Sequence, residues 1–207
     1  MDITRGAIAL KKNKFQLKRE ATYQLLIEAG MLCFSEKGYA ATTLGDIVAR
    51  TGHTKGAFYG HFESKEQLFL EILDYQLQLT TGWTDVPKAY SPAHTTLEEV
   101  LMITLKRLGE MMKGVTNWIV VLTDFYQSTR QNPEVQRKLK EKYREWVAGI
   151  VILIRVLQER GWISEDKDVH RIAVQVIALN EGYIIYSHLF DGADSRAHLS
   201  GLVKLMT

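Results

Sequence analysis

Several features that would fix a protein class are scarce or missing in this sequence. Cysteine occurs once in 207 residues, at Cys33, which excludes an internal disulfide and a cysteine zinc site. Cys33 lies among apolar neighbours, so we expect a small buried hydrophobe there rather than a reactive thiol. No apolar run approaches the roughly 20 residues of a membrane span, and residues 1–15 lack the apolar core and cleavage site of a secretion signal. We therefore expect a cytoplasmic protein.

Strand-like alternation of useful length, internal repeats and low-complexity segments are also absent from the sequence. Apolar residues instead recur at helical spacing along most of the chain. The exception is the stretch 82–94, which contains Pro87 and Pro92 without periodicity and is expected to be a loop. The predicted fold class is all-α, with about nine helices.

Positive charge is concentrated near the start of the chain. Residues 1–66 hold 10 Lys and Arg against 7 Asp and Glu, although the whole chain has a net charge of only +2. The bases at or before the start of the first predicted helix are Arg5, Lys11, Lys12, Lys14, Lys18 and Arg19. An exposed cationic arm there would attract phosphate and could enter a groove of DNA. A solvated, frayed terminus is the equal alternative.

The stretch from Thr42 to Phe69 contains three helix-start signals in close succession. Thr43 precedes an apolar helical spacing, with an acidic residue three positions later that completes a capping-box pattern. Gly52 stands where that helix needs a left-handed terminator. Thr54 and Ser64 then offer N-caps for a short helix and for a longer one. This arrangement predicts a compact helix-turn-helix.

The residues of this stretch resemble the TetR/AcrR family of bacterial transcriptional regulators. The resemblance is carried, in order and spacing, by Gly52, Thr54, Lys55, Gly56, Ala57, Phe58, Tyr59, His61, Phe62, Lys65, Glu66 and Leu68, and upstream by Ala29, Phe34, Gly38, Tyr39, Thr42, Thr43 and Ile47. His53 and Gly60 depart from the family pattern, which has a small apolar residue and a larger side chain there. The resemblance covers the N-terminal third. It implies a three-helix helix-turn-helix DNA-binding domain over 1–66 and a helical ligand-binding and dimerisation domain over 67–207.

A helix-turn-helix protein presents one short helix to the major groove of DNA. Thr54 and Lys55 can donate to phosphate or base at the leading end of that helix, and the small residues beside them let the backbone approach closely. The family resemblance implies phosphate contacts from Tyr59, His61 and Lys65, and from Thr43 at the opposite edge of the groove. His61 could instead cap a helix or pack against its neighbours. The expected DNA-contact residues are Thr43, Thr54, Lys55, Gly56, Ala57, Tyr59, His61 and Lys65.

Specific binding to a pseudo-palindromic operator requires two such units. The predicted helix Val169 to Phe190 carries apolar residues around its whole circumference, so it should be buried on two sides. Together with a last helix near Ala193 to Met206, it resembles the four-helix dimer interface of the family. We expect a homodimer formed through these last two helices, about 169–206.

Aromatic residues within the predicted helices of the second domain suggest a pocket for a small molecule. The expected lining is Met102, Leu105, Trp118, Asp124, Phe125, Trp146, Ile150, Asn180 and Tyr183. Ordinary core packing is the alternative for each of these residues. A buried, ionised Asp124 would favour a cationic ligand.

The most consistent functional hypothesis is a repressor released from double-stranded operator DNA by a small, largely apolar or aromatic inducer. The helix predicted from Lys65 to about Thr81 would transmit the signal between the domains. An enzyme is the competing class, but the sequence has no HExxH motif, nucleophile elbow or phosphate loop, and its histidines are too dispersed for a local metal set. We therefore expect no catalytic residues, no metal and no cofactor. An architectural DNA binder is the other alternative.

Overall fold

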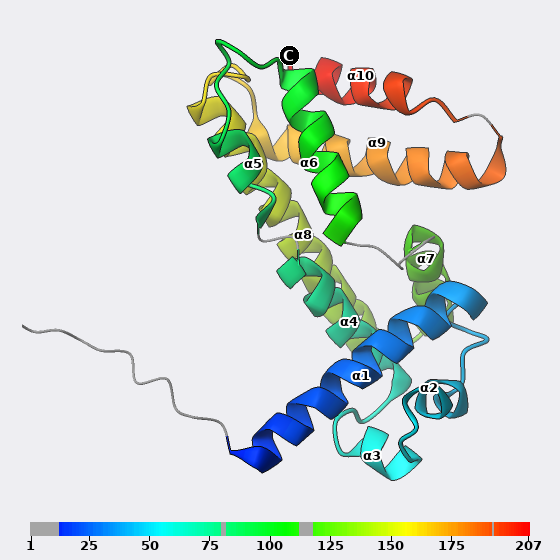
Figure 1. The fold of residues 1–207 in the computed structure, drawn as a ribbon. Helices are drawn as coiled ribbons and strands as arrows, with labels where there is room; N and C mark the ends of the chain where they lie inside the picture. The colour runs from blue at the N-terminus through cyan, green and yellow to red at the C-terminus, as the bar shows by residue number, and fades with distance from the viewer. Residues whose placement is uncertain (1–12, 80–81, 112–117, 192) are drawn as a thin grey trace, which may run out of the picture.

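The computed structural model describes residues 13–79, 82–111, 118–191 and 193–207, and these ranges contain ten helices and no strand (Figure 1). The helices are α1 (Lys14–Lys37), α2 (Leu44–Thr51), α3 (Lys55–Tyr59), α4 (Lys65–Leu79), α5 (Asp85–Lys88), α6 (Leu97–Met111), α7 (Trp118–Thr129), α8 (Pro133–Glu159), α9 (Val169–Leu189) and α10 (Ser195–Met206). The all-α prediction is confirmed.

The caps expected in the helix-turn-helix stretch are present. The Thr43 hydroxyl accepts the backbone N–H of Asp46, whose carboxylate accepts the N–H of Thr43 in return, so α2 begins with a capping box. Gly52 ends α2 with φ of +68°, a left-handed conformation that costs glycine little. Thr54 caps α3 through the N–H of Ala57. Each boundary therefore follows from a local hydrogen bond or from a glycine.

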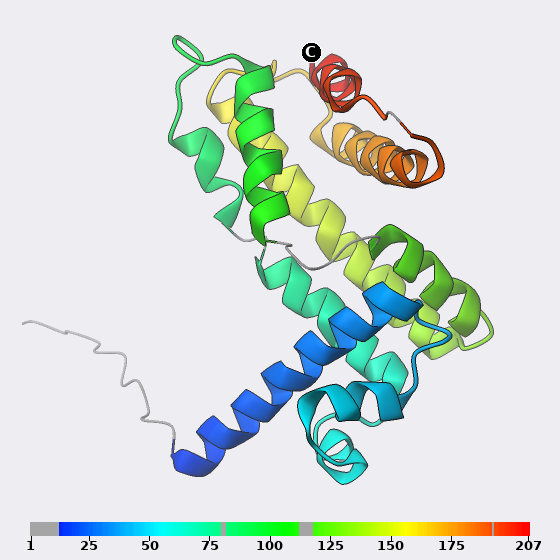
Figure 2. The same cartoon turned by 45° about the vertical axis from the view of Figure 1, so that its right-hand side comes forward.

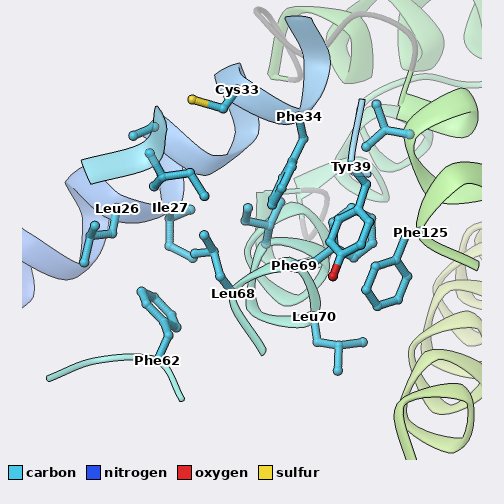
Figure 3. Close-up of a cluster of buried hydrophobic side chains, with 14 of the residues drawn as sticks. Leu26, Ile27, Cys33, Phe34, Tyr39, Phe62, Leu68, Phe69, Leu70 and Phe125 are labelled. Carbon is cyan, nitrogen blue, oxygen red and sulfur yellow. The ribbon is translucent and has the colours of Figure 1, made fainter. Parts of the chain in front are cut away.

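A first hydrophobic cluster joins the N-terminal helices to α4, α7 and α8. Its fully buried rings include Tyr39, Phe69 and Phe125, which lie side by side in Figure 3. Phe69 stacks on Phe125 with ring centroids 4.0 Å apart, and Tyr39 meets Phe125 edge-on at 4.8 Å. Cys33 is buried in the same cluster, as expected. Because Phe69 belongs to this cluster, the expected domain boundary at 66/67 runs through a continuous core.

A second hydrophobic cluster fills the other end of the molecule. It is built from α6, the second half of α8, α9 and α10, with Trp83 added from the segment before α5. The long helix α8 runs between the two ends of the molecule, and both α4 and α9 pack on it. Figure 2 shows α9 and α10 lying side by side at one flank of α8.

One helix was not expected from the sequence. The single-turn helix α5 lies within 82–94, which was predicted to be a loop because of its prolines. Burial explains the helix, because Trp83, Val86 and Pro87 all pack away from solvent and α5 contacts α6 and α8. Among the described residues, no helix combines the length and the hydropathy that crossing a bilayer requires.

Candidate functional site

The leading end of α3 forms an exposed and nearly flat edge. Thr54, Lys55 and Gly56 are exposed, and Ala57 is half-buried. Phe58, fully buried, anchors this short helix to the first cluster. The next residue, Tyr59, keeps 56% of its surface exposed, and its ring lies edge-on to that of Phe58 with centroids 5.6 Å apart. The structure thus brings the expected reading residues together at one exposed end of α3, with Phe58 buried behind them.

Lys65 lies at the start of α4 and is held by the turn between α1 and α2. Its Nζ donates to the carbonyl oxygens of Tyr39 and Thr42, both at 2.8 Å, and lies 4.3 Å from the centre of the Tyr39 ring. Burial lowers the pKa of the Lys65 ammonium, an effect opposed by the carboxylates of Glu66 and Asp124. Two of its three protons therefore fix the position of α4 relative to α2, and one remains for an outside acceptor.

His61 lies between α3 and α1. Its ring centroid is 6.2 Å from those of Tyr23 and Phe62, so the imidazole is partly packed. Burial lowers its pKa, and the positive charges of Arg19 and His53 lower it further. The His61 imidazole therefore takes up a proton less readily than a solvent-exposed histidine.

Thr43 is exposed at the start of α2, with its hydroxyl engaged by Asp46. The charged residues nearby are paired: Lys37 binds Asp46, and Arg50 binds Glu36. These two pairs fasten α2 to α1. Within the described residues, Lys55 of α3 and Lys14 and Lys18 of α1 form no ion pair, so the unpaired positive charge of this region includes these three side chains.

The basic arm expected at the N-terminus is only partly described. Arg5, Lys11 and Lys12 lie outside the described residues, and nothing in the structure bears on their role. Lys14 and Lys18 are exposed on the first turns of α1. Arg19 follows them, close enough to His61 for its charge to lower the pKa of that side chain.

A cavity of about 540 Å³ lies between α4, α6, α7, α8 and α9. Its lining is mostly apolar and aromatic and includes Leu73, Gln76, Leu77, Trp83, Leu101, Thr104, Leu105, Leu108, Trp118, Ile119, Leu122, Lys142, Tyr143, Trp146, Ile150, Leu153, Ile154, Val176, Ile177, Asn180, Glu181 and Ile184. A pocket of this size and character suits a small organic molecule.

Five of the nine residues expected in a pocket line this cavity: Leu105, Trp118, Trp146, Ile150 and Asn180. Four others lie elsewhere. Met102 is 53% exposed on the outer face of α6, and Phe125 is fully buried in the first cluster. Tyr183 stacks on His198 of α10 with ring centroids 4.1 Å apart. Helical spacing gave the correct helices for these residues, but not the face of each helix.

Asp124 is the fourth expected pocket residue that lies outside the cavity, and it joins α7 to the helix-turn-helix. Its Oδ2 accepts the backbone N–H of Ala40 at 2.9 Å. A side chain at Gly38, which has φ of +81°, would bring Cβ to 3.0 Å from the same oxygen. The Asp124 carboxylate thus binds the turn after α1 and is not part of the cavity lining. It therefore gives no reason to expect a cationic ligand.

The sequence reasoning missed the contribution of α4 to the cavity. Leu73, Gln76 and Leu77 line it from the side of the helix that also carries Phe69. The spacing of Phe69, Leu73 and Gln76 is i, i+4, i+7, which places an amide on an otherwise apolar helix face. This spacing is the feature of the sequence from which the contribution of α4 to the cavity could be predicted.

Lys142 and Glu181, two charged residues of the cavity wall, both have partners within the chain. Lys142 pairs with Asp74 of α4 at 2.6 Å, and the Tyr143 hydroxyl donates to Glu181 at 2.6 Å. Burial, followed by the Glu181 carboxylate, raises the pKa of Tyr143, so the phenol keeps its proton. No group of three or more metal-ligating side chains occurs within the described ranges.

A second surface feature is the apolar face shared by α8 and α9. Its large exposed side chains are Ile152, Val174, Ile185, Tyr186, Leu189 and Phe190. A shallow groove of about 440 Å³, lined in part by Val147, Val151 and Val174, continues it between the two helices. By contrast, Leu199 and Leu202 of α10 are buried within the chain's own second cluster.

The sequence matches two family models: residues 26–72 match the bacterial regulatory proteins of the tetR family, and residues 113–204 match the C-terminal region of BetI-type transcriptional repressors. It is 31% identical over 159 residues to the transcriptional regulator QacR of Staphylococcus aureus, covering 75% of this chain and 80% of QacR. It is 29% identical over 202 residues to the regulator YwcC of Bacillus subtilis, covering 96% and 91%. Its fold resembles that of Bacillus subtilis FadR, solved with stearoyl-CoA, with a TM-score of 0.68 at 18% identity, covering 89% and 98%.

Proposed function

The chain belongs to the tetR family of bacterial regulatory proteins and is a DNA-binding transcriptional regulator; we propose that it is a repressor released from a pseudo-palindromic operator by a small, largely apolar or aromatic inducer. The observation that carries this proposal is the dual position of α4. Its first residue, Lys65, holds the turn before α2, and its later residues Leu73 and Gln76 line the cavity. The helix α4 thus contacts both the turn before α2 and the cavity.

For DNA binding, we assign the major-groove contacts to the leading end of α3. Thr54, Lys55, Gly56 and Ala57 meet bases and nearby phosphates, because this end is exposed and sterically small. Tyr59, His61 and Lys65 bind the backbone on one side of the groove, and Thr43 binds it on the other. His61 makes its contact from a partly packed position beside Tyr23 and Phe62.

For release, an inducer stabilises a conformation in which α4 has moved relative to the recognition helices. Leu73, Gln76 and Leu77 would meet such a ligand directly. The shift reaches the DNA-binding helices through the bonds from Lys65 to the carbonyl oxygens of Tyr39 and Thr42. Operator affinity then falls by the ratio of the ligand's affinities for the two conformations.

For operator symmetry, two copies associate through an apolar face. The sequence predicts this face on the last two helices, about 169–206. The exposure pattern favours the second half of α8 together with α9, because α10 directs Leu199 and Leu202 into its own chain. The exposed rings of Tyr186 and Phe190 belong in such a contact, since large exposed apolar patches mark association sites. The dimer acts in the cytoplasm, where it meets its operator.

The test is to select fragments of genomic DNA bound by the full-length protein and to footprint the strongest one. We expect protection of two symmetry-related half-sites, and release of the footprint by an apolar ligand. A promoter reporter carrying the site should be silenced by the protein. Uniform coating of DNA without a defined footprint would instead favour an architectural protein. A footprint that no cavity ligand alters would contradict the inducible mechanism.

A further inference from the structure

Two polar atoms in the cavity wall have no hydrogen-bond partner within the part of the chain that the structure describes. They are Nε2 of Gln76, on α4, and Nε1 of Trp118, on α7. Gln76 is only 4% exposed. A buried donor without a partner costs free energy comparable to a lost hydrogen bond, so proteins seldom retain one without a use for it.

The two unpartnered atoms have the same chemistry. An amide nitrogen and an indole nitrogen both donate, and an indole cannot accept. Thr104 and Tyr143 of the wall are already engaged, because Thr104 donates to the carbonyl oxygen of Val100 at 2.8 Å and Tyr143 donates to Glu181. Asn180, which is half-buried, can both donate and accept. The two fully buried groups that lack a partner are therefore both hydrogen-bond donors.

The charge of the wall indicates a neutral occupant. Its charged or titratable side chains, apart from Tyr143, are Lys142, Glu181 and His188, and Nδ1 of His188 lies 2.6 Å from the carbonyl oxygen of Ile184. Lys142 is paired with Asp74, and Glu181 accepts the Tyr143 hydroxyl. A cation or an anion would have to compete with these existing partners. Most of the remaining lining is apolar and includes Trp83 and Trp146.

The positions of the donors also limit the shape of the occupant. Trp118 stacks on Phe69 of α4 with ring centroids 5.2 Å apart. Gln76 follows Phe69 by seven residues on the same helix face, about 10 Å along the axis. The two donors thus lie toward different ends of the α4 wall, which suits a molecule longer than a single ring.

We propose that the inducer is a neutral, elongated, mostly apolar molecule bearing an oxygen that only accepts hydrogen bonds, as in a ketone, an ester or an ether, and that Gln76 donates to this oxygen. This inference rests on the proposed function, because it specifies the ligand of the same cavity. It also makes Gln76 the point at which α4 senses the ligand.

The test uses two probes of nearly equal shape, methyl naphthyl ketone and isopropylnaphthalene, titrated calorimetrically into the full-length protein without DNA. The wild-type protein should bind the ketone more tightly. In Gln76→Met, which keeps the length and removes the donor, the ratio of the two affinities should shrink by roughly fivefold, the value of one hydrogen bond. Gln76→Leu provides a second apolar replacement, and circular dichroism checks that both variants fold.

Thr104→Val is the matched control. Thr104 also lies in the wall and is also buried, but its hydroxyl already has a partner. Its replacement should leave the ketone preference unchanged. A preference that survives both Gln76 variants would overturn the assignment of Gln76 while leaving the inducible mechanism intact. Failure of both probes to bind the wild-type protein would contradict the ligand cavity itself, and with it the proposed inducer.

Discussion

The carboxylate of Asp124 accepts a hydrogen bond from the backbone N–H of Ala40 across 84 positions of sequence, at 2.9 Å. This bond ties α7, which carries Trp118 in the cavity wall, to the turn that precedes α2. Beside it, Phe125 packs edge-on against Tyr39 at 4.8 Å. The ligand cavity and the DNA-binding helices are thus connected through α7 as well as through α4.

Replacing Asp124 by Ala should loosen this connection. The N–H of Ala40 would lose its partner, at a cost of about 1–2 kcal/mol in the free energy of unfolding. Operator affinity should fall as well, because the turn that Lys65 holds becomes less fixed. Urea unfolding and fluorescence anisotropy with operator DNA measure the two effects. Asp124→Asn, which keeps an acceptor oxygen, should be milder, and equal losses in both variants would contradict the role of the hydrogen bond.

Two lysines near the DNA-binding surface should respond differently to replacement by Ala. Lys55 is exposed at the leading end of α3, so Lys55→Ala should flatten the log–log salt dependence of operator binding by about one unit without altering stability. Lys65→Ala should flatten it by a similar amount and weaken binding to all sequences. It should also destabilise the fold by about 1–3 kcal/mol, because the carbonyl oxygens of Tyr39 and Thr42 lose their donor.

Anisotropy titrations over a range of salt concentrations and urea unfolding separate these contributions. An unchanged salt slope for Lys65→Ala would restrict Lys65 to a structural role. An unchanged slope for Lys55→Ala would remove Lys55 from the phosphate contacts.

Acid should weaken the folded state partly through His198. Its ring is stacked on Tyr183, and burial lowers its pKa below the ordinary value of about 6.5. As the pH falls, the unfolded chain binds this proton first, so the stabilisation is complete above about pH 6.5 and is lost as the pH falls toward the lowered pKa. His198→Phe should therefore flatten the decline in unfolding free energy between about pH 7 and pH 5. An equal flattening by His94→Phe, at an exposed position, would show that the effect is not specific to burial.

The association of two copies should depend on the exposed end of α9. Leu189 is 68% exposed, and Leu189→Glu should convert the dimer into a monomer and sharply weaken operator binding. Leu17→Glu, an equally drastic change at an exposed leucine of α1, should leave the oligomeric state unchanged. Analytical ultracentrifugation measures the result. A Leu189→Glu protein that remains a dimer would place the interface elsewhere.

The local signals in the sequence were enough to predict most helix boundaries. Thr43, Gly52 and Thr54 act through hydrogen bonds or backbone conformations that involve neighbouring residues only. The five expected pocket residues that line the cavity lie on helix faces whose apolar spacing points to the centre of the second domain. These features depend on short-range order, which a single sequence displays directly.

The features that were missed depend on how distant segments meet. Asp124 is polar within an apolar run, which suits a pocket as well as a junction, and only the position of Ala40 decides between them. The contribution of Gln76 depends on the rotation of α4 about its axis relative to α7 and α8. The helix α5 forms because Trp83 and Val86 find an apolar site on α6 and α8, although Pro87 signals a break.

The shared core around Phe125 has a practical consequence for protein engineering. Phe69 and Tyr39 both pack on Phe125 of α7, in a cluster that also contains Val121 of α7 and Leu139 of α8. A chimaera that exchanged residues 1–66 alone would pack a foreign helix-turn-helix against residues of α4, α7 and α8 that fit the native one. New operator specificity is therefore better introduced at the exposed leading end of α3, where side chains can change without disturbing the first hydrophobic cluster.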